Sequence, residues 1–153
     1  MLTRPWQRHY HFDVTTPIRY PRVPNREFLQ ASAKAFPDKT ALHFFGTAMT
    51  FWDLRIHILP MTNALGSLGV QKGDRVDIHL PTRPQLVVAP KAVVSLGGIV
   101  VDLNPMYTAE EPNALVTTNT GISTFITLDT VLSNIRVLDR VEPIIPFEKG
   151  VIT

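Results

Sequence analysis

Hydrophobic positions recur at helical spacing in the first well-patterned stretch of the chain, residues 26–36. Residues three and four positions apart lie on one face of a helix, so this spacing predicts an amphipathic helix. The apolar members of the pattern are Phe28, Leu29, Ala31, Ala35 and Phe36. Pro37 and Asp38 follow at once and predict the end of the helix.

A short strand and a longer helix come next. Residues 40–45 have the composition of a strand, and Gly46 breaks it. Thr50 stands three residues before Asp53, which is the spacing of a capping box, in which the hydroxyl accepts an orphan backbone N–H. We therefore expect a helix over residues 50–68, with Gly69 as its C-terminal cap.

Beyond residue 72 the pattern alternates between extended apolar runs and helical ones. The pattern predicts strands at 75–80, 99–103 and 124–128, and helices at 84–96 and 108–118. Such a βαβαβ series with nearly apolar strands is typical of a parallel sheet that is covered by helices on both faces. The fold class is therefore α/β with a mostly parallel sheet. A further helix is expected at 131–138, and the structure of 141–153 stays open.

The first 25 residues differ from the rest. Four prolines push this segment toward extended geometry, and within residues 1–26 five arginines face a single acid, Asp13. We divide the chain into an extended, basic, proline-rich arm at 1–25 and one partial domain at 26–153. The arginines are Arg4, Arg8, Arg19, Arg22 and Arg26. The prolines prevent a continuous basic helical face, so no nucleic-acid partner is predicted, and membrane contact is at most peripheral.

The composition bears on the cellular compartment in which the protein is expected. The chain has no cysteine, which excludes disulfides and thiolate zinc sites and fits a reducing, cytoplasmic environment, with membrane association left open. The longest apolar run, 86–101, carries Lys91 and is too short to span a bilayer. Only 18% of the residues are charged, so part of the surface is expected to be covered by other protein.

Candidate chemistry is sparse. Gly97 and Gly98 precede a strand, so they predict a tight turn and no phosphate-binding loop. His9 and His11 form a poor zinc site because no third ligand is near. The predicted strands contain His43 and His79, for which a hydrogen-bonded sheet histidine is the ordinary interpretation, and His57 has no acidic partner in sequence.

Nucleophile patterns are missing around the serines, and the paired acids Glu110 and Glu111 suit the first turn of a helix, where they complement its dipole. From the residues alone we predict no catalytic, cofactor-binding or metal-binding residue in this chain.

Several segments, in fixed order, carry a family resemblance. They are FPDKTALHFFG from Phe36, NALGSLGVQKGDRV from Asn63, HLPTRPQ from His79 and NPMYTAEE from Asn104. Together they resemble the N-terminal region of long-chain fatty acid CoA ligases, in the AMP-forming acyl-adenylate superfamily. The resemblance implies the N-terminal subdomain of that ligase fold.

The family's reaction follows from the resemblance. ATP and a fatty acid give an acyl-adenylate and pyrophosphate, and the CoA thiol then takes the acyl group, with Mg²⁺ neutralising the phosphates. The family's phosphate loop lies later in sequence, so this chain alone is expected to bind none of ATP, CoA or Mg²⁺. The matching positions are scaffold, such as Gly73, Asp74, Pro81, Asn104 and Pro105.

Departures from the family pattern suggest relaxed selection. Pro60 and Pro90 fall inside predicted helices, where each costs about 3 kcal/mol, and Pro112 falls near a helix start. Thr82 replaces the asparagine usual after Leu-Pro. We expect an inactive, truncated or degenerate ligase. The alternative is a noncatalytic interaction module that docks on a full-length ligase, or a homodimer formed through the arm.

Overall fold

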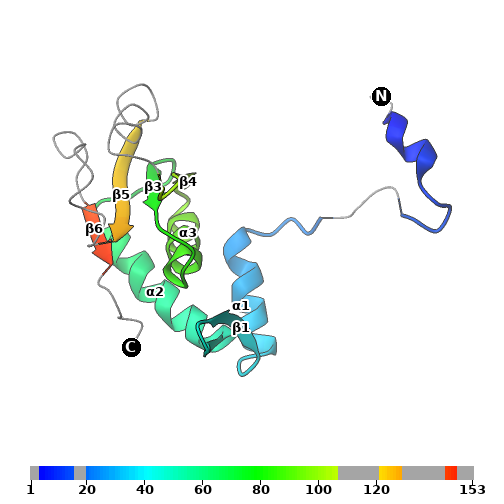
Figure 1. Ribbon diagram of the computed structural model, residues 1–153. Coiled ribbons are helices and arrows are strands. Elements are labelled where there is room, and N and C mark those ends of the chain that lie inside the picture. Colours follow the sequence, from blue (N-terminus) through cyan, green and yellow to red (C-terminus); the bar gives the residue numbers. More distant parts are fainter. Residues whose placement is uncertain (1–3, 16–19, 107–120, 129–143, 148–153) are drawn as a thin grey trace.

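The computed structural model describes residues 4–15, 20–106, 121–128 and 144–147 (Figure 1). After a short 3-10 helix at Pro5–His9, the helices are α1 (Asn25–Ala35), α2 (Phe51–Ser67) and α3 (Gln85–Leu96). The strands are β1 (Thr40–Phe44), β2 (Thr47–Thr50), β3 (Arg75–His79), β4 (Ile99–Asp102), β5 (Ile122–Leu128) and β6 (Ile144–Phe147). Figure 1 shows residues 4–15 lying away from these helices and strands.

The main sheet is parallel in every described pairing, as the apolar strands predicted. Its order is β4-β3-β5-β6. Strand β3 pairs with β4 and β5 on its two sides, with Asp77 opposite both Val101 and Phe125. Alternate residues of a strand point to opposite faces, so Val76 and Ile78 share one face of the sheet. The α/β fold class is confirmed for this sheet.

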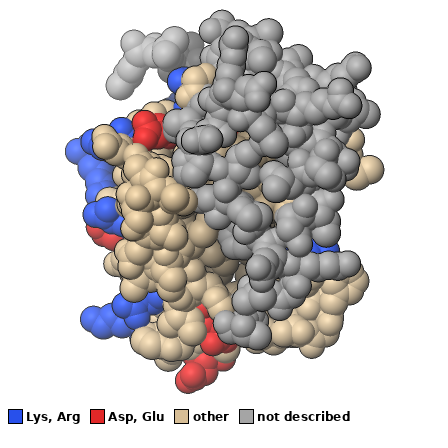
Figure 2. Space-filling model, turned by 90° about the vertical axis from the view of Figure 1, so that its left-hand side faces the viewer, with Lys and Arg blue, Asp and Glu red and all other residues tan. Residues whose placement is uncertain are grey.

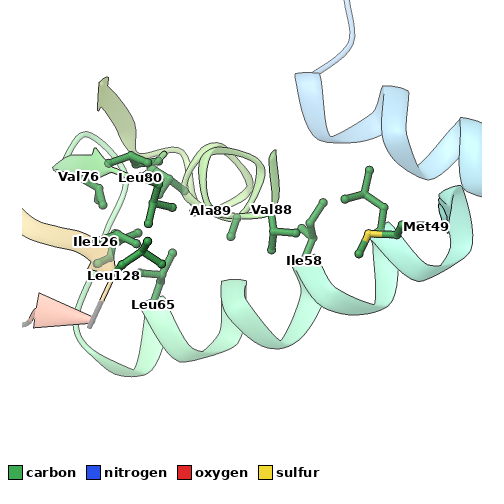
Figure 3. Packing of buried hydrophobic residues seen from close by; sticks show 14 residues of the cluster. Met49, Ile58, Leu65, Val76, Leu80, Val88, Ala89, Ile126 and Leu128 are labelled. Atoms are coloured by element: carbon green, nitrogen blue, oxygen red, sulfur yellow. The ribbon is translucent and has the colours of Figure 1, made fainter. Parts of the chain in front are cut away.

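Helices α2 and α3 pack against the Val76 and Ile78 face. The buried cluster between helices and sheet joins Leu65 of α2 and Ala89 of α3 to Val76, Ile78 and Ile126 of the strands (Figure 3). Each of these five side chains is fully buried. Fully burying an aliphatic side chain stabilises a fold by roughly 1.5 to 3 kcal/mol, so this layer holds the sheet and helices together.

The local signals for α2 and α3 are confirmed. Asp53 N–H donates to Thr50 Oγ1 at 3.1 Å, and Thr50 N–H donates to Asp53 Oδ2 at 2.9 Å, which completes the capping box. Gly97 ends α3 with a left-handed φ of 82°, a conformation that costs glycine little.

Both interior prolines are held within continuous helices. Pro60 lies in α2 and Pro90 lies in α3. Each ring removes one backbone donor, so the carbonyl four residues earlier loses its intrahelical partner. Pro60 is exposed and Pro90 is half-buried.

Two strands were not predicted. A strand β2 follows β1 and pairs with it antiparallel, turning through Phe45 at φ 43° and Gly46 at φ 80°. Strand β6 lies in the tail whose structure the pattern left open. The helices predicted at 108–118 and 131–138 lie outside the described residues.

Candidate functional site

The sheet order places a topological switch point between β3 and β5. The chain passes from β3 to β4 on one side, and β5 then pairs on the other side of β3. In open parallel sheets, ligands bind outside the carboxyl ends of the strands at such a point. The carboxyl ends of β3 and β5 are therefore the first place to look for functional side chains.

Two ionisable side chains of β3 point to the face opposite the aliphatic core. Asp77 is 0% exposed and His79 is 1% exposed. His79 is opposite Thr127 in the register, and its Nδ1 lies 3.4 Å from Thr127 Oγ1. The same hydroxyl donates to the His79 carbonyl at 3.3 Å. The switch point is thus lined by polar groups that are closed off from solvent.

Asp77 is held as a neutral acid. Burial raises the pKa of its carboxyl to about 8, the Ile78 backbone opposes this shift, and the nearby Asp102 carboxylate adds to it. Within the described residues, neither carboxylate oxygen makes a hydrogen bond of ordinary geometry. Burying the charged form without partners is costly, so the carboxyl keeps its proton at neutral pH.

His79 is held as a neutral imidazole. Burial lowers the pKa of the ring, and the Asn104 backbone opposes this shift. Its Nε2 has no hydrogen-bond partner among the described residues. The interpretation of His79 as a satisfied sheet histidine is therefore only half right, because one ring nitrogen is paired and the other is not. His43, the other strand histidine, is exposed on β1.

The connection from β3 to α3 is chemically unsuited to phosphate. Pro81 and Pro84 lie in the five residues that join the two elements, and neither has a backbone N–H. Phosphate-binding loops depend on glycines and on N–H groups at the helix start. At the end of β4, Asn104 Oδ1 accepts the Met106 N–H at 3.0 Å, which folds that connection on itself.

The remaining candidates of the sequence analysis do not assemble into a site. His11 pairs with Asp13 on the exposed arm, and Arg8 donates to His9. In the part of the chain that the structure describes, no three His, Asp or Glu side chains gather as a metal site. Glu110 and Glu111 lie outside the described residues. Gly73 has φ 94°, which confirms its role in the turn before β3.

Sequence reasoning missed Asp77 as a buried polar group and placed His79 in the sheet only as a hydrogen-bonded histidine. The signal was available, because residues 75, 77 and 79 are polar at alternate positions of a strand that was expected to be covered on both faces. Because the strand was interpreted as scaffold, the free-energy cost of burying these two ionisable side chains was not considered.

A concave feature lies beside the start of α3. A pocket of about 450 Å³ is bordered by the β1–β2 hairpin, the first turns of α2 and the α3 start. Gln85 lines it and is 6% exposed, and its Oε1 has no partner among the described residues. The half-buried Arg83 also lines this pocket.

Known proteins resemble this chain in sequence. A family profile described as AMP-binding enzyme matches residues 29–150. A long-chain-fatty-acid–CoA ligase of Bacillus subtilis is 34% identical over 160 aligned positions, covering 97% of this chain and 28% of the relative. An acetyl-coenzyme A synthetase of Streptomyces avermitilis is 43% identical over 65 residues, covering 39% of this chain and 10% of the relative.

Solved structures share the fold. A long-chain-fatty-acid-CoA ligase from Archaeoglobus fulgidus matches with a TM-score of 0.75 at 23% identity, covering 87% of this chain and 28% of that one. The N-terminal subdomain of a Klebsiella oxytoca adenylation protein matches with a TM-score of 0.73 at 20% identity, covering 83% and 32%. In each comparison, this chain spans less than a third of the relative's length.

Proposed function

The chain belongs to the AMP-binding enzyme family, and from that premise we propose that it supplies N-terminal scaffold of a long-chain fatty acid CoA ligase and does not catalyse the ligation by itself. The observation that carries the proposal is the sequence match to the Bacillus ligase along 97% of this chain. That relative is named for long-chain fatty acids, which makes a fatty acid the proposed substrate class of the whole enzyme.

The switch point supports a structural role for the described residues. The two ionisable groups there, Asp77 and His79, are closed off from solvent and held neutral. A general acid or base must come within hydrogen-bond reach of its substrate, so groups buried in this way do not act on a bound molecule in this conformation. We propose that the face they line is an internal layer of a larger enzyme.

The described residues do not fit the nucleotide and metal of the reaction. Magnesium prefers carboxylate and water oxygens in octahedral geometry. Asp77 is protonated at neutral pH, and its neighbour Asp102 offers a single carboxylate. The β3–α3 connection with Pro81 and Pro84 lacks the amides of a phosphate cradle. We therefore assign ATP, CoA and Mg²⁺ to other parts of a complete ligase.

The test is a thioester assay on the purified chain of 153 residues with ATP, Mg²⁺, CoA and palmitate. We expect no palmitoyl-CoA above the level of a heat-treated sample. A purified Bacillus subtilis ligase in the same buffer is the positive control. Formation of palmitoyl-CoA by the chain alone would overturn the proposal that it does not catalyse the ligation by itself.

A second candidate function is that of a noncatalytic module that docks on an intact ligase. The exposed aromatic side chains of the arm favour it, since Trp6 is 56% exposed and Phe12 is 93% exposed. Aromatic side chains are enriched at the buried centres of protein interfaces. Size-exclusion chromatography with a full-length ligase tests this candidate, with a Trp6→Ser/Phe12→Ser variant as control. A complex that forms equally with both chains would exclude the arm as the docking element.

A further inference from the structure

A small cleft lies where α1, α2 and α3 meet, and it is separate from the switch point. Its cavity volume is about 120 Å³. Each helix contributes one basic residue to the lining, namely Arg26 from α1, Arg55 from α2 and Lys91 from α3. Leu29, Ile58 and Leu59 supply the apolar part of the lining. We call this feature the three-helix cleft.

The positive charge of the three-helix cleft is not neutralised within the described residues. None of its lining residues is acidic. The ion pair between His11 and Asp13 lies on the arm and involves none of the three basic residues of the cleft. Three like charges around one small volume repel each other, and bringing an anion between them relieves that repulsion. The cleft therefore has the electrostatics of an anion site.

The basic side chains are oriented by neutral partners. Lys91 Nζ donates to Asn25 Oδ1 at 2.7 Å, across from α3 to α1. The Arg55 guanidinium lies 5.0 Å from the centre of the Trp52 ring. These contacts position both cations but leave their charge uncompensated. The guanidinium donors of Arg55 suit the oxygens of a phosphate group.

Two acids lie near the three-helix cleft without lining it. Glu27 lines an adjacent depression together with Arg26 and Lys34. Asp53, two residues before Arg55, accepts the Thr50 N–H in the capping box of α2. Figure 2 shows Lys and Arg side chains along the left-hand edge of the face it presents, beside a tan area without charged side chains. The cleft is thus a local concentration of positive charge on a weakly charged protein.

An exposed apolar stripe borders the three-helix cleft. Trp52, Ile56 and Leu59 are four and three positions apart on α2, so they share one side of that helix. Their exposed fractions are 47%, 46% and 57%. Leu59 lines the three-helix cleft, and the Arg55 guanidinium lies over the Trp52 ring. The apolar stripe is therefore adjacent to the basic side chains of the cleft. Aromatic and aliphatic side chains next to cations are typical of surfaces that rest on a bilayer.

We propose that the three-helix cleft binds the phosphate headgroup of an anionic phospholipid, with the Trp52, Ile56 and Leu59 stripe resting on the acyl chains at the bilayer surface. The small cavity admits a headgroup and excludes an acyl chain. The stripe then accounts for the apolar side of the contact. This inference does not depend on ligase activity.

The experiment is vesicle flotation of the full chain. Vesicles of phosphatidylcholine alone are compared with vesicles that also contain phosphatidylglycerol. We expect flotation with the anionic vesicles only, and we expect a change of at least tenfold in apparent affinity for Arg26→Gln/Arg55→Gln/Lys91→Gln. The matched control removes the same charge from the arm, as Arg4→Gln/Arg8→Gln/Arg22→Gln, and should lose less than threefold. Circular dichroism confirms that both variants are folded.

A second readout follows the stripe directly. In a Trp6→Phe chain, Trp52 is the single tryptophan. Its emission should shift to the blue on adding anionic vesicles, and inorganic phosphate at matched ionic strength should reverse the shift more than chloride does. A shift that neutral vesicles produce equally, flotation that the arm variant abolishes while the cleft variant keeps it, or no flotation at all would each overturn the proposal.

Discussion

The two faces of strand β3 are equally buried and chemically opposite. Val76 and Ile78 lie in the aliphatic cluster with α2 and α3, whereas Asp77 and His79 lie on the other face. The aliphatic face gains free energy from every methylene removed from water. The polar face gives up hydration, and within the described residues it recovers only the Thr127 hydrogen bonds of His79. Burial alone therefore does not say which side stabilises the fold.

The largest expected effect comes from truncating the aliphatic face. Ile78→Ala should lower the free energy of unfolding by about 2 to 5 kcal/mol, because it leaves a cavity among fully buried neighbours. Asp77→Ala, one residue away, should leave stability unchanged or raise it, because it removes a buried carboxyl without hydrogen bonds. Urea unfolding of both variants measures the contrast. Equal losses would mean that the two faces contribute alike.

Helix α2, which covers the aliphatic face, contains Pro60 in its interior, and this proline is expected to lower the stability of the fold. Pro60→Ala should stabilise the chain by up to about 3 kcal/mol, because it restores the hydrogen bond to the Ile56 carbonyl and relieves the ring clash. Thermal melting measures the gain. Pro84→Ala is the matched control, since Pro84 occupies the N-cap of α3, where no intrahelical donor is lost. An unchanged melting temperature for Pro60→Ala would show that α2 already accommodates the ring without cost.

The polar face should make stability depend on pH. The folded state keeps the Asp77 proton up to about pH 8, whereas an unfolded aspartate releases it near about pH 3.9. The unfolded state thus binds fewer protons between these values, so the free energy of unfolding falls as pH rises. Between pH 6.5 and 7.5 we expect Asp77 to contribute a loss of about 1.4 kcal/mol per pH unit, which levels off above pH 8.

Asp77→Asn serves as the control for that slope, because the amide does not titrate. Burial lowers the pKa of His79, so its unfolded state binds more protons than its folded state near pH 6.5, and His79 adds a slope of opposite sign. Both chains contain His79, so the difference between their curves reports Asp77. Denaturation at several pH values compares the two chains. A wild-type curve parallel to that of the Asn variant would show that Asp77 is ionised in the folded protein.

Much of the fold follows from sequence, for identifiable reasons. The βαβ alternation and the Thr50 capping spacing depend on contacts within a few residues, and the structure has both features. Strand β2 was not predicted, because its two-residue turn places Phe45 at positive φ, where glycine or asparagine is the usual sequence signal. The pairing partner of β6 is distant in sequence, so periodicity could not reveal it.

The functional features were less accessible to sequence reasoning. The three-helix cleft joins Arg26, Arg55 and Lys91, which are far apart in the chain and meet only after α1, α2 and α3 pack. The arginine count grouped Arg26 with the arginines of the arm, so its place beside Arg55 and Lys91 was not predicted. Asp77 and His79 were visible in the sequence, but only the sheet register shows that no described partner neutralises the carboxyl.

The smallest expected effect on the free energy of unfolding comes from removing one hydroxyl, that of Thr50 at the start of α2. Thr50→Val should lower the free energy of unfolding by about 1 kcal/mol, because the Asp53 N–H at the start of α2 loses its acceptor. Thr50→Ser keeps that acceptor and should behave like the wild type in the same melts. Because α2 covers the Val76 and Ile78 face, the cap stabilises the sheet only through the helix. Its loss should therefore add to that of Ile78→Ala in a double variant, within about 0.5 kcal/mol. A clear departure from additivity would mean that the start of α2 and the centre of β3 are coupled.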